Sequence, residues 1–180
     1  MPTHQMKNYA QGYTKKDAPV RMSPGVLVSE AYAVKSCTAD MIGFIEANMQ
    51  VAKLDGKLQR ALADTDKGYF KSGAMIQGLI WEQYPFPVEL KQVLAGNSDT
   101  MIYQATIATK LSPPLQPQSD VLINKTGSTN SFATYVAFIP AQKSGIVILA
   151  NKNYPIDARV TAAYEILTAL GSQTGSKTEH

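Results

Sequence analysis

The clearest pattern of apolar and polar positions lies in the last third of the chain. Asp120–Lys125 is predicted to be a strand, and Phe132–Ile139 and Ser144–Ala150 are two further strand-like runs rich in β-branched and aromatic residues. A short turn joins the last two runs, which predicts an antiparallel hairpin. Ile156–Leu170 places apolar residues on one helical face, so we expect a helix that packs across the hairpin. The residues of that face are Val160, Ala163, Tyr164, Leu167 and Leu170.

Two helices are predicted in the first half of the chain. After Thr38, apolar residues recur at steps of three and four, which predicts a helix with Thr38 as its N-cap and Gly56 as its end. A second, shorter helix is expected over Lys57–Thr65. The residues that it is expected to bury are Leu58, Ala61 and Leu62. Before these helices, residues 1–37 contain Gly and Pro at a density that favours an extended segment.

The middle of the chain gives a weaker pattern. Aromatic and β-branched residues between Gly68 and Pro87 predict short strands, in particular over Met75–Gln83. Ser112–Pro117 is rich in proline and is predicted to be a loop. The fold is therefore predicted to be α+β, an antiparallel sheet with a packed C-terminal helix and a small helical part. Its predicted parts are an extended segment (1–37), a helical part (38–66), the sheet with its C-terminal helix (67–170) and a disordered tail (171–180).

Composition narrows the function classes. With 180 residues, 44% hydrophobic and 17% charged, the chain can bury a core in one domain or a small two-lobed unit. Its net charge is only +3 and its basic residues are scattered, so no nucleic-acid footprint is visible. The single cysteine, Cys37, excludes an internal disulfide, and His4 and His180 lie at the loose ends, so we expect no metal site or other cofactor. Every apolar run is far shorter than the roughly 20 residues of a membrane span, and Met1–Gln11 has no signal-peptide core, so we expect a soluble chain without an export signal.

The candidate chemistry is concentrated in Lys125, Thr126 and Gly127, at the end of a predicted strand. The lysine supplies positive charge to a carboxylate or a developing anion, and the threonine hydroxyl can donate a hydrogen bond beside it. Because Gly127 has no Cβ, a planar substrate can lie against the strand. On these three residues alone, an exposed lysine at a strand end followed by a turn is the favoured interpretation.

The surrounding residues resemble the C-terminal region of class C serine β-lactamases, in consistent order and spacing from Pro2 to Leu170. Residues 8–13 resemble the family's Tyr-Ala-Trp-Gly-Tyr segment, residues 24–32 its Ω-type loop and residues 77–82 its Gly-Trp-Glu stretch. The segments that carry the likeness around the candidate motif are Asn124–Phe132, Tyr135–Pro140 and Gly145–Pro155.

The resemblance implies a role for each matching residue. Lys125 and Thr126 would contact the β-lactam carboxylate. Gly127 follows them, and the backbone N–H of the next residue, Ser128, would be one of two oxyanion-hole donors. Tyr32 would line the side-chain pocket. The polar residues that would support the strand or help hold the carboxylate are Glu82, Asn153 and Arg159. The resemblance also implies a β-lactam substrate, a periplasmic location, and no cofactor, nucleic-acid or membrane partner.

The chain departs from the family in its nucleophile. The family attacks the lactam with the serine of a Ser-x-x-Lys motif, assisted by the tyrosine of Tyr-x-Asn. In these 180 residues no serine has lysine three positions later, and no tyrosine has asparagine two positions later. We therefore expect the family's N-terminal half to be a missing partner and this chain alone to be inactive. A non-catalytic β-lactam or peptidoglycan-binding module, or a fragment of a penicillin-binding or esterase relative, are the alternatives.

Milder departures concern the strand and its surroundings. Ser131 and Ala133 stand where the family usually has glycine, and a side chain would be strained there if φ were positive. Ile80 and Ile156 replace a glycine and an asparagine of the family pattern, and Ile156 would remove a donor from the carboxylate site. Without the other half, the sheet over Asp120–Ala150 is expected to expose an apolar face and an unpaired edge, which predicts poor solubility, dimerisation or partial unfolding.

Overall fold

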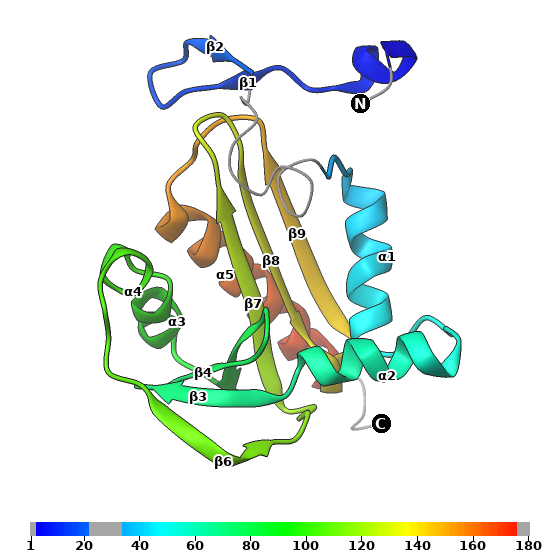
Figure 1. The fold of residues 1–180 in the computed structure, drawn as a ribbon, viewed down its shortest axis with the longest axis vertical. Coiled ribbons are helices and arrows are strands. Elements are labelled where there is room, and N and C mark those ends of the chain that lie inside the picture. The colour runs from blue at the N-terminus through cyan, green and yellow to red at the C-terminus, as the bar shows by residue number, and fades with distance from the viewer. Residues whose placement is uncertain (1–2, 22–33, 176–180) are drawn as a thin grey trace.

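The computed structural model describes residues 3–21 and 34–175. Its centre is a seven-stranded sheet in the order β6-β3-β4-β5-β7-β8-β9, in which every neighbouring pair is antiparallel (Figure 1). The strands are β3 (Gly68–Ser72), β4 (Met75–Gln77), β5 (Glu82–Pro85), β6 (Thr109–Leu115), β7 (Val121–Ser128), β8 (Ala133–Ile139) and β9 (Ser144–Ala150).

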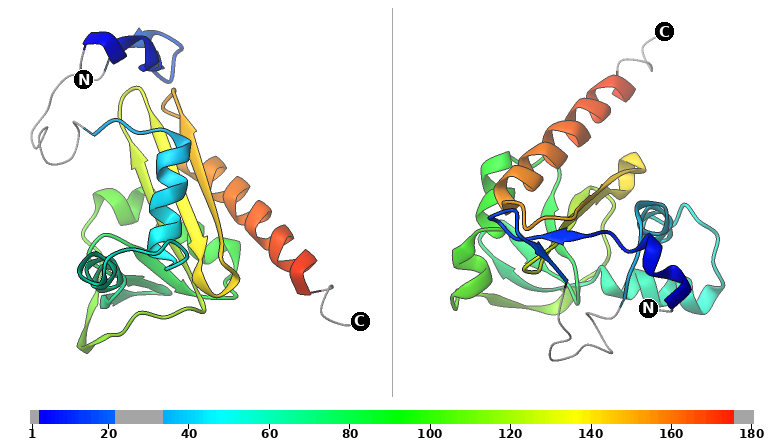
Figure 2. Two further views of the ribbon diagram at one scale, coloured as in Figure 1. Left: turned by 90° about the vertical axis from the view of Figure 1, so that its right-hand side faces the viewer. Right: turned by 90° about the horizontal axis from the view of Figure 1, so that it is seen from above.

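Helices cover both faces of this sheet. α1 packs on one face of β9 and α5 on the other face, so that β7, β8 and β9 lie between two helical layers (Figure 2). Within the described residues, no helix is both long and apolar enough to cross a bilayer. The helices are α1 (Thr38–Asn48), α2 (Gly56–Thr65), α3 (Leu90–Gly96), α4 (Asp99–Tyr103) and α5 (Ile156–Gly175).

The core follows from the alternation of side chains along β8. Tyr135 and Ala137 belong to the apolar cluster on the α5 side, which includes Val160 and Leu167. Phe138, on the opposite face, joins the cluster beneath α1. Because β8 is covered on both faces, its sequence is apolar at every position except Thr134 and does not alternate.

The N-terminal segment lies across one end of the sheet. It contains a 3-10 helix (Thr3–Asn8) and the two short strands β1 (Gly12–Tyr13) and β2 (Pro19–Val20). The Tyr13 N–H donates to the Asn151 carbonyl at 2.8 Å, which joins β1 to the chain just after β9. A Cβ on Gly12 would lie 2.7 Å from that of Ser131, so glycine permits this close approach.

The predicted elements of the last third are confirmed. β7, β8, β9 and α5 occupy the predicted segments, and the fold is α+β as expected. The tail is partly wrong, because α5 continues through residues 171–175 as regular helix. Residues 176–180 lie outside the described residues.

Four further expectations are corrected. Cys37, and not Thr38, is the N-cap of α1, while Gly56 begins α2, where the Asp55 carboxylate accepts from two backbone N–H groups. α2 buries none of its residues, and Leu58 is 47% exposed. The loop predicted over Ser112–Pro117 is largely strand β6. Prolines are tolerated there because β6 is the edge strand of the sheet.

The expected strain at Ser131 and Ala133 and the expected exposure of the sheet face are also corrected. Neither Ser131 nor Ala133 has a positive φ, so replacing glycine strains neither position. The expected open apolar face of the β7–β9 region is covered by α1 and α5, whereas β9 does form an edge of the sheet.

Candidate active site

Strand β7 extends beyond its neighbour β5. β5 pairs with Val121–Asn124. Its first residue, Glu82, lies opposite Asn124, so the pairing of β5 with β7 does not continue past Asn124. Lys125–Ser128 continue the strand, paired with β8 alone among the described residues. On the side of β7 that faces β5, backbone groups of this stretch therefore have no strand partner and can bind a ligand.

A hollow of about 480 Å³ lies beside this open stretch. Lys125 and Thr126 line it from β7, and Glu82 lines it from β5. The remaining walls come from the β3–β4 hairpin and from the region of α3 and α4, and mix polar with apolar side chains. These residues are Phe70, Ser72, Met75, Gln77, Gly96, Asn97, Met101, Ile102, Thr106 and Ala108.

Lys125 forms an ion pair at the edge of the hollow. Its Nζ lies 2.5 Å from Oε1 of Glu82. The Lys125 side chain is 47% exposed, whereas that of Glu82 is 11% exposed. Because an ammonium has three donors, Lys125 can bind a second anionic group while Glu82 holds it in place.

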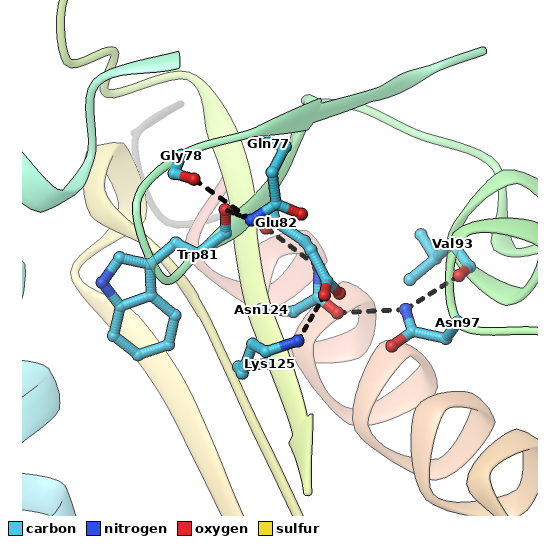
Figure 3. Close-up of polar contacts among 8 residues, drawn as sticks. All are labelled: Gln77, Gly78, Trp81, Glu82, Val93, Asn97, Asn124 and Lys125. Carbon is cyan, nitrogen blue, oxygen red and sulfur yellow. Dashed lines mark hydrogen bonds and ion pairs between the residues drawn. The ribbon is translucent and has the colours of Figure 1, made fainter. Parts of the chain in front are cut away.

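Two asparagines connect this ion pair to α3 (Figure 3). Asn124 Nδ2 donates to the Glu82 carbonyl at 3.0 Å, and Asn97 Nδ2 donates to Asn124 Oδ1 at 3.1 Å. Asn97 Nδ2 also donates to the Val93 carbonyl at 3.0 Å. The chain of amides ties β5, β7 and the end of α3 together directly behind Lys125.

Arg159 supports the same strand from the α5 side. It is 2% exposed, and burial lowers its pKa. Its Nη1 donates to the carbonyls of Gly127 at 2.9 Å and Thr134 at 2.5 Å, and its Nη2 donates to Ser128 Oγ at 2.9 Å. Nε donates to the Pro155 carbonyl. The guanidinium thus braces the end of β7 and is not part of the lining of the hollow.

Gly127 is required by the neighbouring strand. A Cβ at this position would lie 2.6 Å from Thr134 Oγ1, the residue directly opposite on β8. The backbone of Gly127 is nevertheless part of the open stretch of β7. Its lack of a side chain therefore serves the β7–β8 contact as well as access to the strand.

The other residues predicted for the site lie elsewhere or outside the described residues. Asn153 donates its backbone N–H to the Tyr13 carbonyl at 3.3 Å and does not line the hollow. Tyr32, with the whole Ω-type loop at residues 24–32, lies outside the described residues.

Sequence reasoning missed Asn97 and the α4 wall. Asn124 was visible as a polar residue in an otherwise apolar strand, which indicates a buried hydrogen-bond partner. Asn97 had no comparable signal, because its role depends on where α3 ends relative to β7.

Comparison with known proteins is consistent with this geometry. Residues 2–171 match the sequence profile of the family Beta-lactamase. The β-lactamase of Pseudomonas fluorescens is 48% identical over 170 residues, covering 94% of this chain and 48% of that protein. The β-lactamase of Lysobacter lactamgenus is 45% identical over 171 residues, covering 95% of this chain and 44% of that protein.

Solved structures give the same assignment. A D-alanine carboxypeptidase from Burkholderia cenocepacia superposes with a TM-score of 0.91 at 51% identity, covering 94% of this chain and 49% of that one. A class C β-lactamase from Rhodobacter sphaeroides superposes with a TM-score of 0.89 at 40% identity, covering 94% and 48%. This chain spans about half the length of the curated relatives it matches. It belongs to the β-lactamase family, with class C enzymes among its structural neighbours.

Proposed function

We propose that this chain supplies the carboxylate-binding and oxyanion-stabilising wall of a class C serine β-lactamase site, whose nucleophile lies on polypeptide outside these 180 residues. The observation that carries the proposal is the stretch Lys125–Ser128, which runs past β5 and whose first two residues, Lys125 and Thr126, line a hollow of about 480 Å³. An open strand edge with an adjacent cation suits a flat, carboxylate-bearing ligand.

Each residue of this wall has a defined part in the proposal. Lys125 and Thr126 bind the carboxylate of the β-lactam through charge and a hydroxyl donor. The Ser128 N–H stabilises the negative charge that develops on the lactam carbonyl oxygen, because a preorganised donor costs no reorganisation during the reaction. Arg159 and Glu82 are positioning residues, since one braces the end of β7 and the other orients Lys125.

Tyr32 and Asn153 stay predictions from the resemblance. Tyr32 would line the pocket for the substrate's side chain, and Asn153 would support the carboxylate side. A periplasmic site of action also follows from the family and belongs to the proposal.

Hydrolysis by this chain alone is not expected. Loss of the nucleophile in serine hydrolases of a different fold lowers kcat on the order of a millionfold. No Ser-x-x-Lys occurs in these residues to replace it. The chain can therefore contribute binding and charge stabilisation, but no acyl-enzyme.

A peptide ending in D-alanine is the second candidate ligand. One structural neighbour, from Burkholderia cenocepacia, is named a D-alanine carboxypeptidase, and another, from Pseudomonas syringae, is named a β-lactamase/D-alanine carboxypeptidase. Such a peptide ends in a carboxylate, which Lys125 and Thr126 could bind in the same way.

Two measurements on the purified chain test the proposal. With a chromogenic cephalosporin we expect no turnover above background. In an NMR titration of the 15N-labelled chain, we expect a penicillin at millimolar concentration to shift the backbone amides of Lys125–Ser128, and Lys125→Ala to abolish the shifts.

The matched control is Lys57→Ala, which removes an exposed lysine on α2 and should leave the titration unchanged. Turnover that Lys125→Ala abolishes would show that a nucleophile is present. If neither penicillin nor a D-Ala-D-Ala peptide shifts these amides at millimolar concentration, the proposed binding role is wrong.

A further inference from the structure

The turn between β7 and β8 sets the direction of the Ser128 N–H. In this turn the Thr129 N–H donates to the Phe132 carbonyl at 2.9 Å, and Thr129 Oγ1 accepts from the Phe132 N–H at 2.9 Å. Successive residues of an antiparallel strand direct their backbone groups to opposite sides, so the Ser128 N–H points away from β8, toward the open side of β7. A change in the turn would therefore turn this N–H.

The N-terminal segment packs on this turn from outside the sheet. Residues 3–21 lie across the end of the sheet where the turn is found (Figure 1). The ring of Tyr9 stacks on that of Phe132, with centroids 6.0 Å apart and 12° between the planes. A Cβ on Gly12 would lie 2.7 Å from Cβ of Ser131 and 2.9 Å from Cε2 of Phe132. The segment thus contacts two consecutive residues of the turn, of which Ser131 is fully buried.

Two cations lie against the ring of Tyr9. The guanidinium carbon of Arg21 is 4.6 Å from the ring centroid, and Nζ of Lys35 is 5.6 Å from it. Both distances are within the range of cation–π contacts. Arg21 Nη1 also donates to the Ala10 carbonyl at 3.1 Å, which fixes the guanidinium beside the ring. The position of Tyr9 is therefore set by these cations as well as by Phe132.

The same segment is anchored to the chain that follows β9. Besides the backbone bond from Tyr13 to Asn151, Asn151 Nδ2 donates to the Gln11 carbonyl at 2.9 Å. Lys152 Nζ lies 2.6 Å from Asp17 Oδ1. Because the segment is fixed to the end of β9 and also packs on the β7–β8 turn, it holds the turn in place relative to the sheet.

We infer that Tyr9 and Phe132 are positioning residues, which hold the Ser128 N–H in the direction that the oxyanion requires. This role rests on the proposed function, because it assigns that N–H to the developing charge. The carboxylate is bound earlier on the strand, by Lys125 and Thr126. Loss of the stack should therefore weaken binding of the transition state more than binding of the substrate, which lowers kcat and leaves KM nearly unchanged.

Residual dipolar couplings of the 15N-labelled chain test the structural part, because they report the direction of each N–H bond. We expect Tyr9→Leu to change the coupling of Ser128, and Gly12→Ala to do the same. The couplings of Val121–Asn124, inside the sheet, should stay unchanged. Tyr9→Phe keeps the stacked ring and is the matched control. Arg21→Gln leaves both rings in place and should give a smaller change. An unchanged Ser128 coupling in every folded variant would overturn the inference.

Kinetics separates this role from the proposed function. The enzyme is a chimera in which residues 2–171 replace the matching half of the Pseudomonas fluorescens β-lactamase. With a chromogenic cephalosporin, we expect kcat to be at least about 10-fold lower for Tyr9→Leu than for Tyr9→Phe, and KM to agree within about twofold. Lys125→Ala is the reference, because it removes the charge that binds the carboxylate and should raise KM.

The two failures have different signatures. If Lys125→Ala lowers kcat/KM but Tyr9→Leu and Tyr9→Phe have the same kcat, the positioning role is wrong and the proposed function stands. If Lys125→Ala leaves kcat/KM unchanged, the proposed function is wrong, and the catalytic role of the stack is wrong with it. A Tyr9→Leu variant that raises KM and keeps kcat would also overturn the inference, because the stack would then act on substrate binding.

Discussion

At the scale of single residues, the site depends on a buried cation, Arg159, for which the described part of the chain supplies no carboxylate partner. Among the described residues, the partners of Arg159 are three carbonyls and the Ser128 hydroxyl. These charge-assisted hydrogen bonds offset the desolvation that lowers the pKa of Arg159. Arg159 therefore links the stability of the fold to the position of the proposed oxyanion donor.

Removing this guanidinium should destabilise the protein. Arg159→Met removes the guanidinium donor from the carbonyls of Gly127 and Thr134 and from the Ser128 hydroxyl, so we expect a loss of about 2–4 kcal/mol in the free energy of unfolding. Urea denaturation measures it. Arg60→Met, on exposed α2, should change stability by less than about 0.5 kcal/mol. Similar losses of unfolding free energy in the two variants would show that the hydrogen bonds of Arg159 do not stabilise the fold.

Asp66 makes stability depend on pH. Its side chain is 6% exposed, Oδ1 has no hydrogen-bond partner, and burial raises its pKa to about 7. A folded-state pKa above the unfolded value means that ionisation opposes folding. The penalty is absent below about pH 4, grows as the pH rises and is fully present above pH 7.

Asp66→Asn should remove this penalty. We expect the variant to gain about 1–3 kcal/mol over the unmodified chain at pH 8, and much less at pH 4.5. Urea unfolding at the two pH values measures the difference, with Asp120→Asn, an exposed site, as the control. A gain that is the same at both pH values would contradict a buried, titrating carboxyl.

At the scale of elements, the decisive feature is the length difference between β5 and β7. β5 begins at Glu82, opposite Asn124, and the four residues that follow Asn124 on β7 have no β5 partner and form the open wall. That wall is held by β8, where Gly127 and Thr134 lie face to face.

Because Gly127 and Thr134 are in close contact, we expect substitutions at the two positions to have non-additive effects on stability. Gly127→Ala should cost about 1–2 kcal/mol, because the new methyl group meets Thr134 Oγ1. Adding Thr134→Ala removes the obstructing hydroxyl and should recover part of the loss. A double-mutant cycle by urea denaturation measures the coupling, and strictly additive effects would show that the two residues do not clash.

The sequence predicts the elements whose pattern is local and misses those set by tertiary context. The β8–β9 hairpin and α5 follow from their own apolar periodicity. β6 is a strand despite its prolines because it pairs on only one side, which local pattern does not reveal. Lys125, Thr126 and Glu82 were predicted and line the hollow, whereas Asn97 needed the packing of α3 to be found.

At the scale of the whole molecule, the chain has the fold of about half of a β-lactamase. It closes its own core, with helices on both faces of the sheet, and leaves open the end of β7 and the edge of β9. In our account, the open end of β7 meets substrate.

The central claim is tested most directly by a chimera. Residues 2–171 of this chain replace the matching half of the Pseudomonas fluorescens β-lactamase, to which they are 48% identical over 170 residues. Hydrolysis of a chromogenic cephalosporin is measured for the chimera, for its Lys125→Ala and Lys57→Ala variants, and for this chain alone. We predict that the chimera turns over substrate, that Lys125→Ala lowers kcat/KM by at least about 100-fold while Lys57→Ala does not, and that the chain alone is inactive. A folded chimera without turnover, or one that Lys125→Ala leaves unchanged, would contradict the account.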